Sequence, residues 1–273
     1  MTVTPLLDWS SPGFVVTIGL YILFASVAHG LEPYHGTVWI NPGVITAADP
    51  TTFLSLDDAG RHDRQVWDSR IRKWSIIKTY VFNARYDDGL LIEVLVNPEY
   101  GSTSAATQVA DRYARILGQI PTGLRVGVNM LTIHKGYEGA NGGGNHDINL
   151  HEDHAEETMA RGFLEEMILH EAVHATLGPN HNNDEDWQRA QTLDGMYIST
   201  YARDYPHTED LAESLSTWFL ARFRTERMPD ETLRTIYRSI PNRLAYFDAL
   251  LLDMYPYGGR STVVLKTILT AIE

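Results

Sequence analysis

Hydrophobic residues fall into two patterns along the chain. Between residues 36 and 151 they form short runs or alternate with polar residues, which is typical of β-strands. From about residue 156 onward they recur every three or four positions, which is typical of helices that bury one face. Because the strands precede the helices and do not alternate with them, the order predicts an α+β fold.

The clearest strand signal is a hairpin. Ile76–Ala84 and Leu90–Val96 are rich in β-branched and aromatic residues, and Asp87-Asp88-Gly89 between them predicts a turn. A helix is expected over Ala105–Leu117, where the apolar residues have helical spacing. Shorter strands are expected at Thr37–Ile40, Leu124–His134 and His146–Leu150.

The second half is expected to begin with a long helix over Glu156–Leu177, which starts with acidic residues and stops at Gly178-Pro179. Thr208 is the expected N-cap of a helix over Thr208–Phe223, because acidic residues follow it in the first turn. The remaining helical signals are one or two helices within Asp184–Ala202, helix starts at Pro229-Asp230 and Ser239-Ile240-Pro241, and an apolar pattern from Ser261. No linker interrupts the chain, so residues 29–273 are expected to form one domain.

Residues 1–28 are expected to be a signal peptide. Phe14–Ala28 contains twelve apolar residues among 15 and no charge, which is short for a membrane span but suits a signal peptide. Ser26 and Ala28 are small residues of the kind that precede cleavage, which would leave His29 first. Because the start of the chain is not basic, a retained membrane anchor and a buried N-terminal element are alternatives. A cleaved signal predicts a secreted protein, whereas the alternatives place it in a membrane or in the cytoplasm.

Composition narrows the classes of function. The 273 residues include 35 acidic and 22 basic side chains, and the formal net charge of −13 disfavours nucleic acid as a partner. Cysteine is absent, which excludes disulfides, thiolate zinc sites and a cysteine nucleophile. Eight of the 11 histidines lie between His134 and His207, so we expect metal or acid–base chemistry in that region.

The segment His170-Glu171-Ala172-Val173-His174 is an HExxH motif within an expected helix. Residues four apart project from the same face of a helix, so two imidazoles can bind one metal ion. Glu171 would then lie beside a water molecule on that ion and could accept its proton. We therefore predict one zinc ion on His170 and His174, with Glu171 as the catalytic base.

A catalytic zinc site usually has three protein ligands and one open position. Glu209 and Glu213 lie four residues apart on their expected helix, so one could bind zinc while the other accepts the free N–H of a ligand histidine. His181 is a rival third ligand, but it and Gly178 each come one residue later than the metzincin pattern requires. Glu209 is favoured, and His181 and Glu213 are the alternatives.

Residues 156–220 resemble the gluzincin class of zinc metallopeptidases, since HEAVH is followed downstream by a helix carrying EDLAES. The segment is more similar to the catalytic domain of anthrax lethal factor and its toxin-like relatives than to the thermolysin branch. The resemblance implies a zincin-like fold, in which a mixed N-terminal β-sheet precedes a helical active-site half. It also implies zinc binding by Glu209 and support of a ligand histidine by Glu213. A tyrosine that steadies the oxyanion is implied as well, with Tyr201 preferred over Tyr205.

Together these residues predict zinc-dependent hydrolysis of peptide bonds in a peptide or protein substrate. Membrane contact is expected only if residues 14–28 form an uncleaved anchor. One alternative is a metzincin-like protease that uses His181. The other is a zinc-containing binding module without turnover, which the intact Glu171 disfavours.

The remaining candidates carry weaker signals. Gly142–Leu150 is expected to form an edge strand near the cleft, where an extended peptide can pair with it. His146, His151 and His154 are a further, unspecific candidate metal group. His134 and His207 are expected to be polar residues at the surface.

Overall fold

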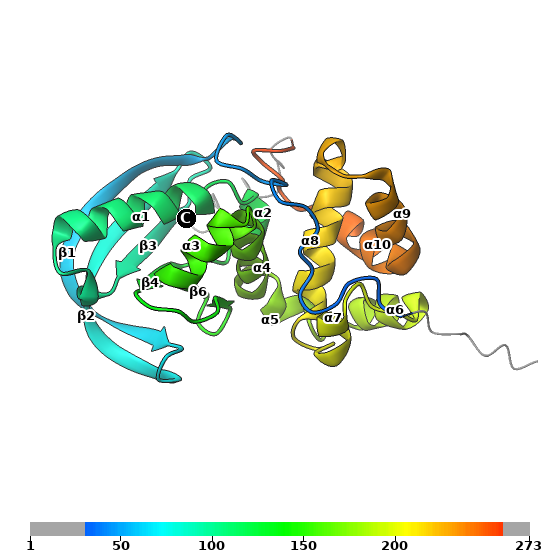
Figure 1. Cartoon of the computed structure of the whole chain (residues 1–273), viewed down its shortest axis with the longest axis horizontal. Helices are drawn as coiled ribbons and strands as arrows, with labels where there is room; N and C mark the ends of the chain where they lie inside the picture. The colour runs from blue at the N-terminus through cyan, green and yellow to red at the C-terminus, as the bar shows by residue number, and fades with distance from the viewer. Residues whose placement is uncertain (1–30, 259–273) are drawn as a thin grey trace, which may run out of the picture.

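A β-sheet and a group of helices lie side by side in the structure, a computed structural model that describes residues 31–258 (Figure 1). This part of the chain contains one mixed sheet of six strands and ten α-helices, so the predicted α+β class is confirmed. The expected signal peptide, residues 1–28, and the apolar pattern from Ser261 lie outside the described residues.

The sheet has the strand order β1-β2-β3-β4-β6-β5. Its strands are β1 (Phe53–Asp68), β2 (Lys73–Tyr86), β3 (Leu91–Val96), β4 (Met130–His134), β5 (Asn141–Gly142) and β6 (Asp147–His151). The pairs β1–β2, β2–β3 and β5–β6 are antiparallel, whereas β3–β4 and β4–β6 are parallel. Because β5 is last in the order, its outer edge has no strand beside it among the residues described.

The helices follow the strands in sequence, except for two that lie between β3 and β4. They are α1 (Thr103–Leu117), α2 (Thr122–Arg125), α3 (Glu152–Ala160), α4 (Leu164–Thr176), α5 (Gly178–His181), α6 (Glu185–Asp194), α7 (Thr200–Asp204), α8 (Asp210–Phe223), α9 (Asp230–Ser239) and α10 (Pro241–Ala249). Short 3₁₀ turns occur at Pro98–Tyr100 and Thr225–Arg227.

The expected single helix over Glu156–Leu177 is wrong, because the chain forms α3 and α4 there with a break between them. Gly162 lies at the break with a φ of 80°, a conformation that favours glycine. A Cβ atom at this position would lie 3.0 Å from Cβ of Pro42, so glycine also permits a close approach of two segments.

The predicted strands are confirmed where a hydrophobic segment also pairs with another strand. The hairpin of β2 and β3 is confirmed, with Gly89 at a φ of 91° in its turn. The expected strand at Thr37–Ile40 is wrong, since this segment is a loop whose Val38 N–H is bonded to a side chain. Of Leu124–His134, the last five residues form β4, whereas the start belongs to α2.

The longest strand, β1, was not expected from its sequence. Many of its 16 residues are charged or exposed, because it forms the other edge of the sheet and pairs only with β2 along its length. The sequence of β1 therefore lacks the alternation of buried and exposed residues that would predict a strand, although its antiparallel pairing with β2 extends from Phe53 to Asp68.

Alternate residues of the central strands enter different cores, as the pleat requires. Val94 and Val96 of β3 belong to the main core, which also contains Val109 of α1 and Val173 of α4. Leu95 points the opposite way and belongs to a small cluster with Val66 and Val81. Helices α1 and α4 thus lie against one face of the sheet, while Val66, near the end of β1, packs on the other.

The end of the β1–β2 hairpin arches over the sheet, as Figure 1 shows. The carbonyl of Trp67 accepts a hydrogen bond of 3.0 Å from Nε2 of His134 on β4, although β2 and β3 separate these strands in the sheet. His134 is fully buried, so its expected place at the surface is wrong. Its ring stacks on His151 at 5.1 Å, and Nδ1 accepts from the amide of Asn97 at 3.0 Å. His134 is therefore held as the neutral imidazole.

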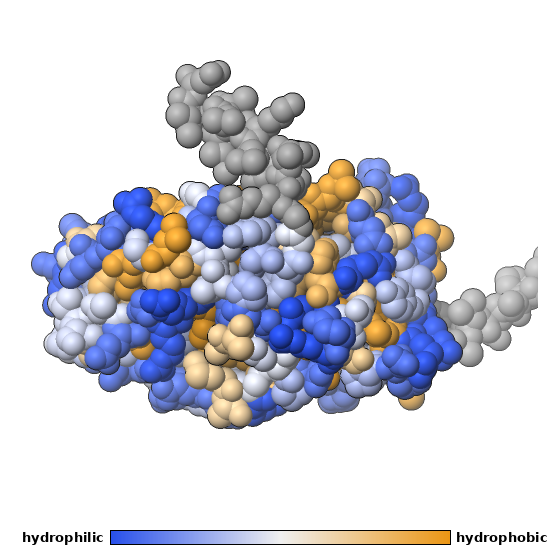
Figure 2. All heavy atoms as spheres, turned by 90° about the horizontal axis from the view of Figure 1, so that it is seen from above, coloured by the Kyte–Doolittle hydropathy of each residue, from blue (hydrophilic) through white to orange (hydrophobic). Residues whose placement is uncertain are grey.

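None of the helices within residues 31–258 is long and apolar enough to cross a membrane. On the face of the molecule seen in Figure 2, hydrophobic residues are interspersed with hydrophilic ones.

Protonation of His134 is expected to destabilise the fold. Burial and the neighbouring His151 lower the pKa of His134 from about 6.5 to about 4, despite the opposing charge of Asp68. Because the unfolded chain binds the proton more readily, stability falls as the pH drops from about 6.5 to about 4. The full shift corresponds to about 3 kcal/mol. The measurement is denaturant unfolding of the wild type and of His134→Gln across this range. Equal pH dependence in the two proteins would contradict the assignment.

Candidate metal centre

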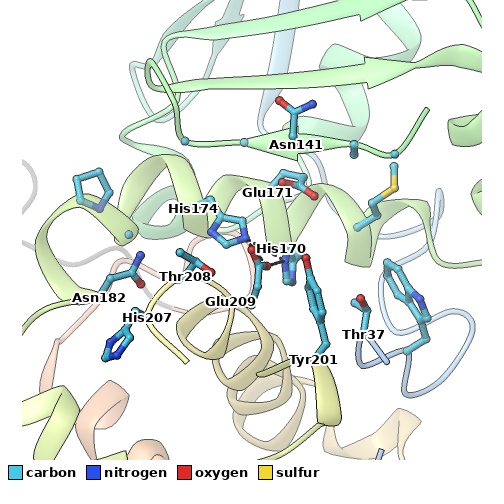
Figure 3. A pocket seen from close by; sticks show the side chains of 18 of the residues that line it. Thr37, Asn141, His170, Glu171, His174, Asn182, Tyr201, His207, Thr208 and Glu209 are labelled. Carbon is cyan, nitrogen blue, oxygen red and sulfur yellow. Dashed lines mark hydrogen bonds and ion pairs between the residues drawn. The ribbon is translucent and has the colours of Figure 1, made fainter. Parts of the chain in front are cut away.

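The two histidines of the HExxH motif meet on one face of α4, as their spacing predicts (Figure 3). Their Nε2 atoms lie 3.0 Å apart and their ring centroids 4.8 Å apart. Both side chains are largely buried, with exposed fractions of 10% for His170 and 15% for His174. Two imidazole nitrogens are thus presented to the same point from one turn of helix.

Glu209 completes the group from a distant segment. Its Oε2 atom lies 3.2 Å from Nε2 of His170 and 3.1 Å from Nε2 of His174. The expected N-cap role of Thr208 is wrong, since α8 begins at Asp210 and Glu209 occupies the position before it. The N–H groups of Thr208 and Glu209 both donate to the carbonyl of Tyr205, so a turn leads directly into the helix. This turn directs the Glu209 side chain at the histidines.

The three donor atoms fit a metal ion. The ligand atoms of His170, His174 and Glu209 all lie within 4.8 Å of one another, and this group could hold a cation. Ligands about 2.0–2.1 Å from one tetrahedral ion stand about 3.3 Å apart, close to the separations of 3.0–3.2 Å seen here. Two histidines and one carboxylate are also a donor set found in catalytic zinc sites.

The charges of these side chains favour a cation as well. Burial raises the pKa of Glu209, but its hydrogen bonds to His170 and His174 outweigh this effect and lower it to about 2. Burial likewise lowers the pKa of His170, but Glu209, Glu171 and Glu213 outweigh it and raise it to about 9. The carboxylates therefore stabilise positive charge at the point where the ligand atoms converge.

His181 lies elsewhere. It ends the short helix α5, and its Nδ1 accepts a hydrogen bond of 2.6 Å from the hydroxyl of Tyr246. Neither does the group of His146, His151 and His154 converge, since His146 donates to backbone carbonyls and His151 stacks on another ring. The cluster found among the described residues that suits a metal is the one with Glu209.

Glu213 lies behind the cluster, one turn of α8 beyond Glu209. Its Oε2 accepts from the backbone N–H of Val38 at 2.8 Å and from the hydroxyl of Ser199 at 2.7 Å. Its Oε1 faces Nδ1 of His170 at 3.7 Å and has no closer partner in the structure. Glu213 is thus placed to orient the ring of His170. The two anchors of its other oxygen, Val38 and Ser199, were not found from the sequence.

Glu171 and Tyr201 line the same cavity of about 840 Å³ as His170, His174 and Glu209 (Figure 3). Burial raises the pKa of Glu171, partly offset by the two histidines. Burial and the nearby carboxylates raise the pKa of Tyr201 to about 12, so its hydroxyl keeps its proton at neutral pH. Tyr205 is not a lining residue of this cavity, and its ring packs on that of Tyr201 at 5.1 Å.

One wall of the cavity is β5, which lies directly against α4. A Cβ atom on Gly142 would be 2.4 Å from the carbonyl oxygen of Glu171, and one on Gly143 would be 2.9 Å from that of His174. Glycines are therefore required at both positions for the strand to reach the helix. The expected edge strand over Gly142–Leu150 is only partly right, because the edge strand is β5, whereas β6 pairs with β4 on one side and with β5 on the other. The sequence did not indicate that the glycines allow the contact with α4.

Substitution of Glu209 and of His181 is expected to show which of the two is the third metal ligand. Glu209→Ala removes one of three donors and should weaken metal binding by more than the 10–100-fold that supporting residues typically contribute. His181→Ala should bind the metal as the wild type does, because His181 lies outside the cluster. Metal content after dialysis and titration with Zn²⁺ measure both effects. Full retention of metal in Glu209→Ala would refute the assignment.

No family model, no curated protein and no solved structure matches this chain. The assignment of the cluster therefore depends on the residues themselves and on how the fold arranges them.

Proposed function

We propose that the chain is a zinc metallopeptidase of the gluzincin type, with a zincin-like fold and one zinc ion on His170, His174 and Glu209. The observation that carries the proposal is the position of Glu171. This carboxylate lies on the same helix as the histidines and lines the same cavity as the three donor atoms. A group that bound metal only for stability would have no need of a buried carboxylate at this place.

The ion, when bound, would supply Lewis acidity that polarises a peptide carbonyl and makes water more acidic. Glu171 accepts the proton of the attacking water and passes it to the leaving amine. Its side chain suits both steps, because it faces the cavity and the raised pKa brings it closer to neutral pH. Tyr201 donates its hydroxyl proton in a hydrogen bond to the oxygen that becomes negative in the transition state.

The strand edge in the cleft and the net charge of the chain favour a polypeptide substrate. No strand lies beside the outer edge of β5 among the described residues, and Asn141 and Gly142 of β5 line the cavity. An extended peptide can add to such an edge. The net charge of −13 favours peptides that are neutral or basic. Secretion, which the sequence of residues 1–28 favours, would give the enzyme access to extracellular proteins or peptides.

Replacement of the proposed base is expected to abolish hydrolysis without loss of metal. Glu171→Gln keeps the size of the side chain but cannot accept a proton, so kcat should fall by about 10²–10⁴-fold. Cleavage of a broad peptide library, measured with and without a chelator, gives the rate, and metal analysis gives the occupancy. Unchanged turnover would refute this mechanism. Peptide binding without any cleavage by the wild type would favour a binding module instead.

Loss of the tyrosine hydroxyl is expected to act on the transition state. Tyr201→Phe should lower kcat by about 10²–10³-fold and leave KM nearly unchanged, as removal of one oxyanion donor does. Tyr205→Phe is the matched control, because its ring packs on Tyr201 without lining the cavity. A larger loss of activity in Tyr205→Phe would reverse the assignment of the two residues.

A further inference from the structure

A second cavity of about 530 Å³ lies beside the first. Its walls come from the end of the β1–β2 hairpin, from the segment that contains β5, and from Asp147 and Asn149 of β6. Residues 139–142 line both cavities, so this thin segment separates them. The volume falls within the range of about 300–1,000 Å³ that is usual for small-ligand pockets.

Two tryptophans form the apolar wall of this second cavity. Trp67 of β1 and Trp74 of β2 are directly paired across the hairpin, and their rings meet edge to face at 5.8 Å. Both rings are partly exposed, in contrast to the fully buried Trp187. Partly exposed, preordered aromatic rings are the usual apolar anchors of binding sites.

Polar contacts hold the hairpin end in place over β5. Ser69 accepts a hydrogen bond from the indole N–H of Trp67 at 3.2 Å and another from the amide of Asn141 at 2.8 Å. Trp74 reaches Gly144, where an added Cβ would lie 3.6 Å from the indole ring. The tryptophan wall is thus fixed relative to the strand that borders the metal centre.

The turn of the hairpin is conformationally strained at the rim. Arg72 lines the cavity with a φ of 49°, which is uncommon for a residue other than glycine. Such strain persists where the surrounding contacts enforce it, and it is concentrated at binding sites. The hydrogen bond from Asn141 of β5 to Ser69 is one contact that holds the hairpin beside this turn.

We propose that the Trp67–Trp74 cavity is a specificity subsite, which takes a bulky apolar side chain, aromatic or long aliphatic, of the polypeptide substrate. This inference rests on the proposed peptidase function. Successive side chains of an extended peptide point to opposite sides. A peptide bound along residues 139–142 would therefore direct one set of side chains at the metal cavity and the other at the tryptophans.

The test is a cleavage profile of the zinc-loaded full chain on a randomised peptide library. Wild type is expected to prefer bulky apolar residues over alanine at one substrate position by at least about tenfold. Trp74→Ala should lose the preference at that position alone, and Trp74→Phe should keep most of it. Ile76→Ala is the matched control, because Ile76 lies on the same strand, is 75% exposed and lines neither cavity.

The outcomes distinguish failure of the subsite proposal from failure of the peptidase proposal. Cleavage with no bulky apolar preference, or with a preference that Trp74→Ala leaves unchanged, overturns the subsite and leaves the peptidase proposal standing. Absence of cleavage by zinc-loaded wild type overturns both. If Trp74→Ala has a lowered Tm or zinc content, Trp74→Leu replaces it, since leucine keeps apolar packing and removes the indole. Loss of the preference in that variant supports the subsite, and retention overturns it.

Discussion

The arrangement of the helical half depends on two carboxylates at the start of α8 that face the histidines of α4, the largely buried Glu209 and the fully buried Glu213. A buried charge is costly unless it is paired, so Glu209 and Glu213 strongly constrain what surrounds them. Oε2 of Glu209 lies within 3.2 Å of both Nε2 atoms, and Glu213 accepts hydrogen bonds from the hydroxyl of Ser199 and the N–H of Val38. These contacts bring α4 and the loop that contains Val38 to the start of α8, although both are distant from it in sequence. The contacts that form the candidate metal centre are therefore also contacts that hold the helices together.

The sheet forms one side of the cleft because β5 lies very close to α4. Gly142 and Gly143 let the β5 segment lie against the carbonyl groups of α4, and this contact brings a sheet edge that has no neighbouring strand within residues 31–258 to the rim of the candidate metal cavity. On the far side of β5, the arched β1–β2 hairpin is held through Ser69 and through the buried His134. The cleft thus lies between α4, which carries the proposed zinc ligands and base, and β5, the strand proposed to bind a chain. Both sides of the cleft suit the proposed hydrolysis of a polypeptide.

Local patterns in the sequence predicted local features well. The spacing of His170 and His174, the β2–β3 hairpin and α1 all follow from residues close together in the chain. Features that depend on distant partners were missed. The charged strand β1 exists because β2 pairs with it, and the expected strand at Thr37–Ile40 is a loop because Val38 binds a carboxylate 175 residues away. Tertiary contacts override hydrophobic pattern in both cases.

A cation at the cluster would stabilise the folded chain by the free energy with which it binds, because the unfolded chain does not bring its donors together. That stabilisation would fall on the contact between α4 and the start of α8, where Glu209 meets the histidines. Through Glu213 it would extend to the loop that contains Val38 and to Ser199 before α7. The β1–β2 hairpin depends on separate apolar and polar contacts. Metal affinity and the order of the proposed catalytic residues would therefore be linked, while the tryptophan cavity is held by different contacts.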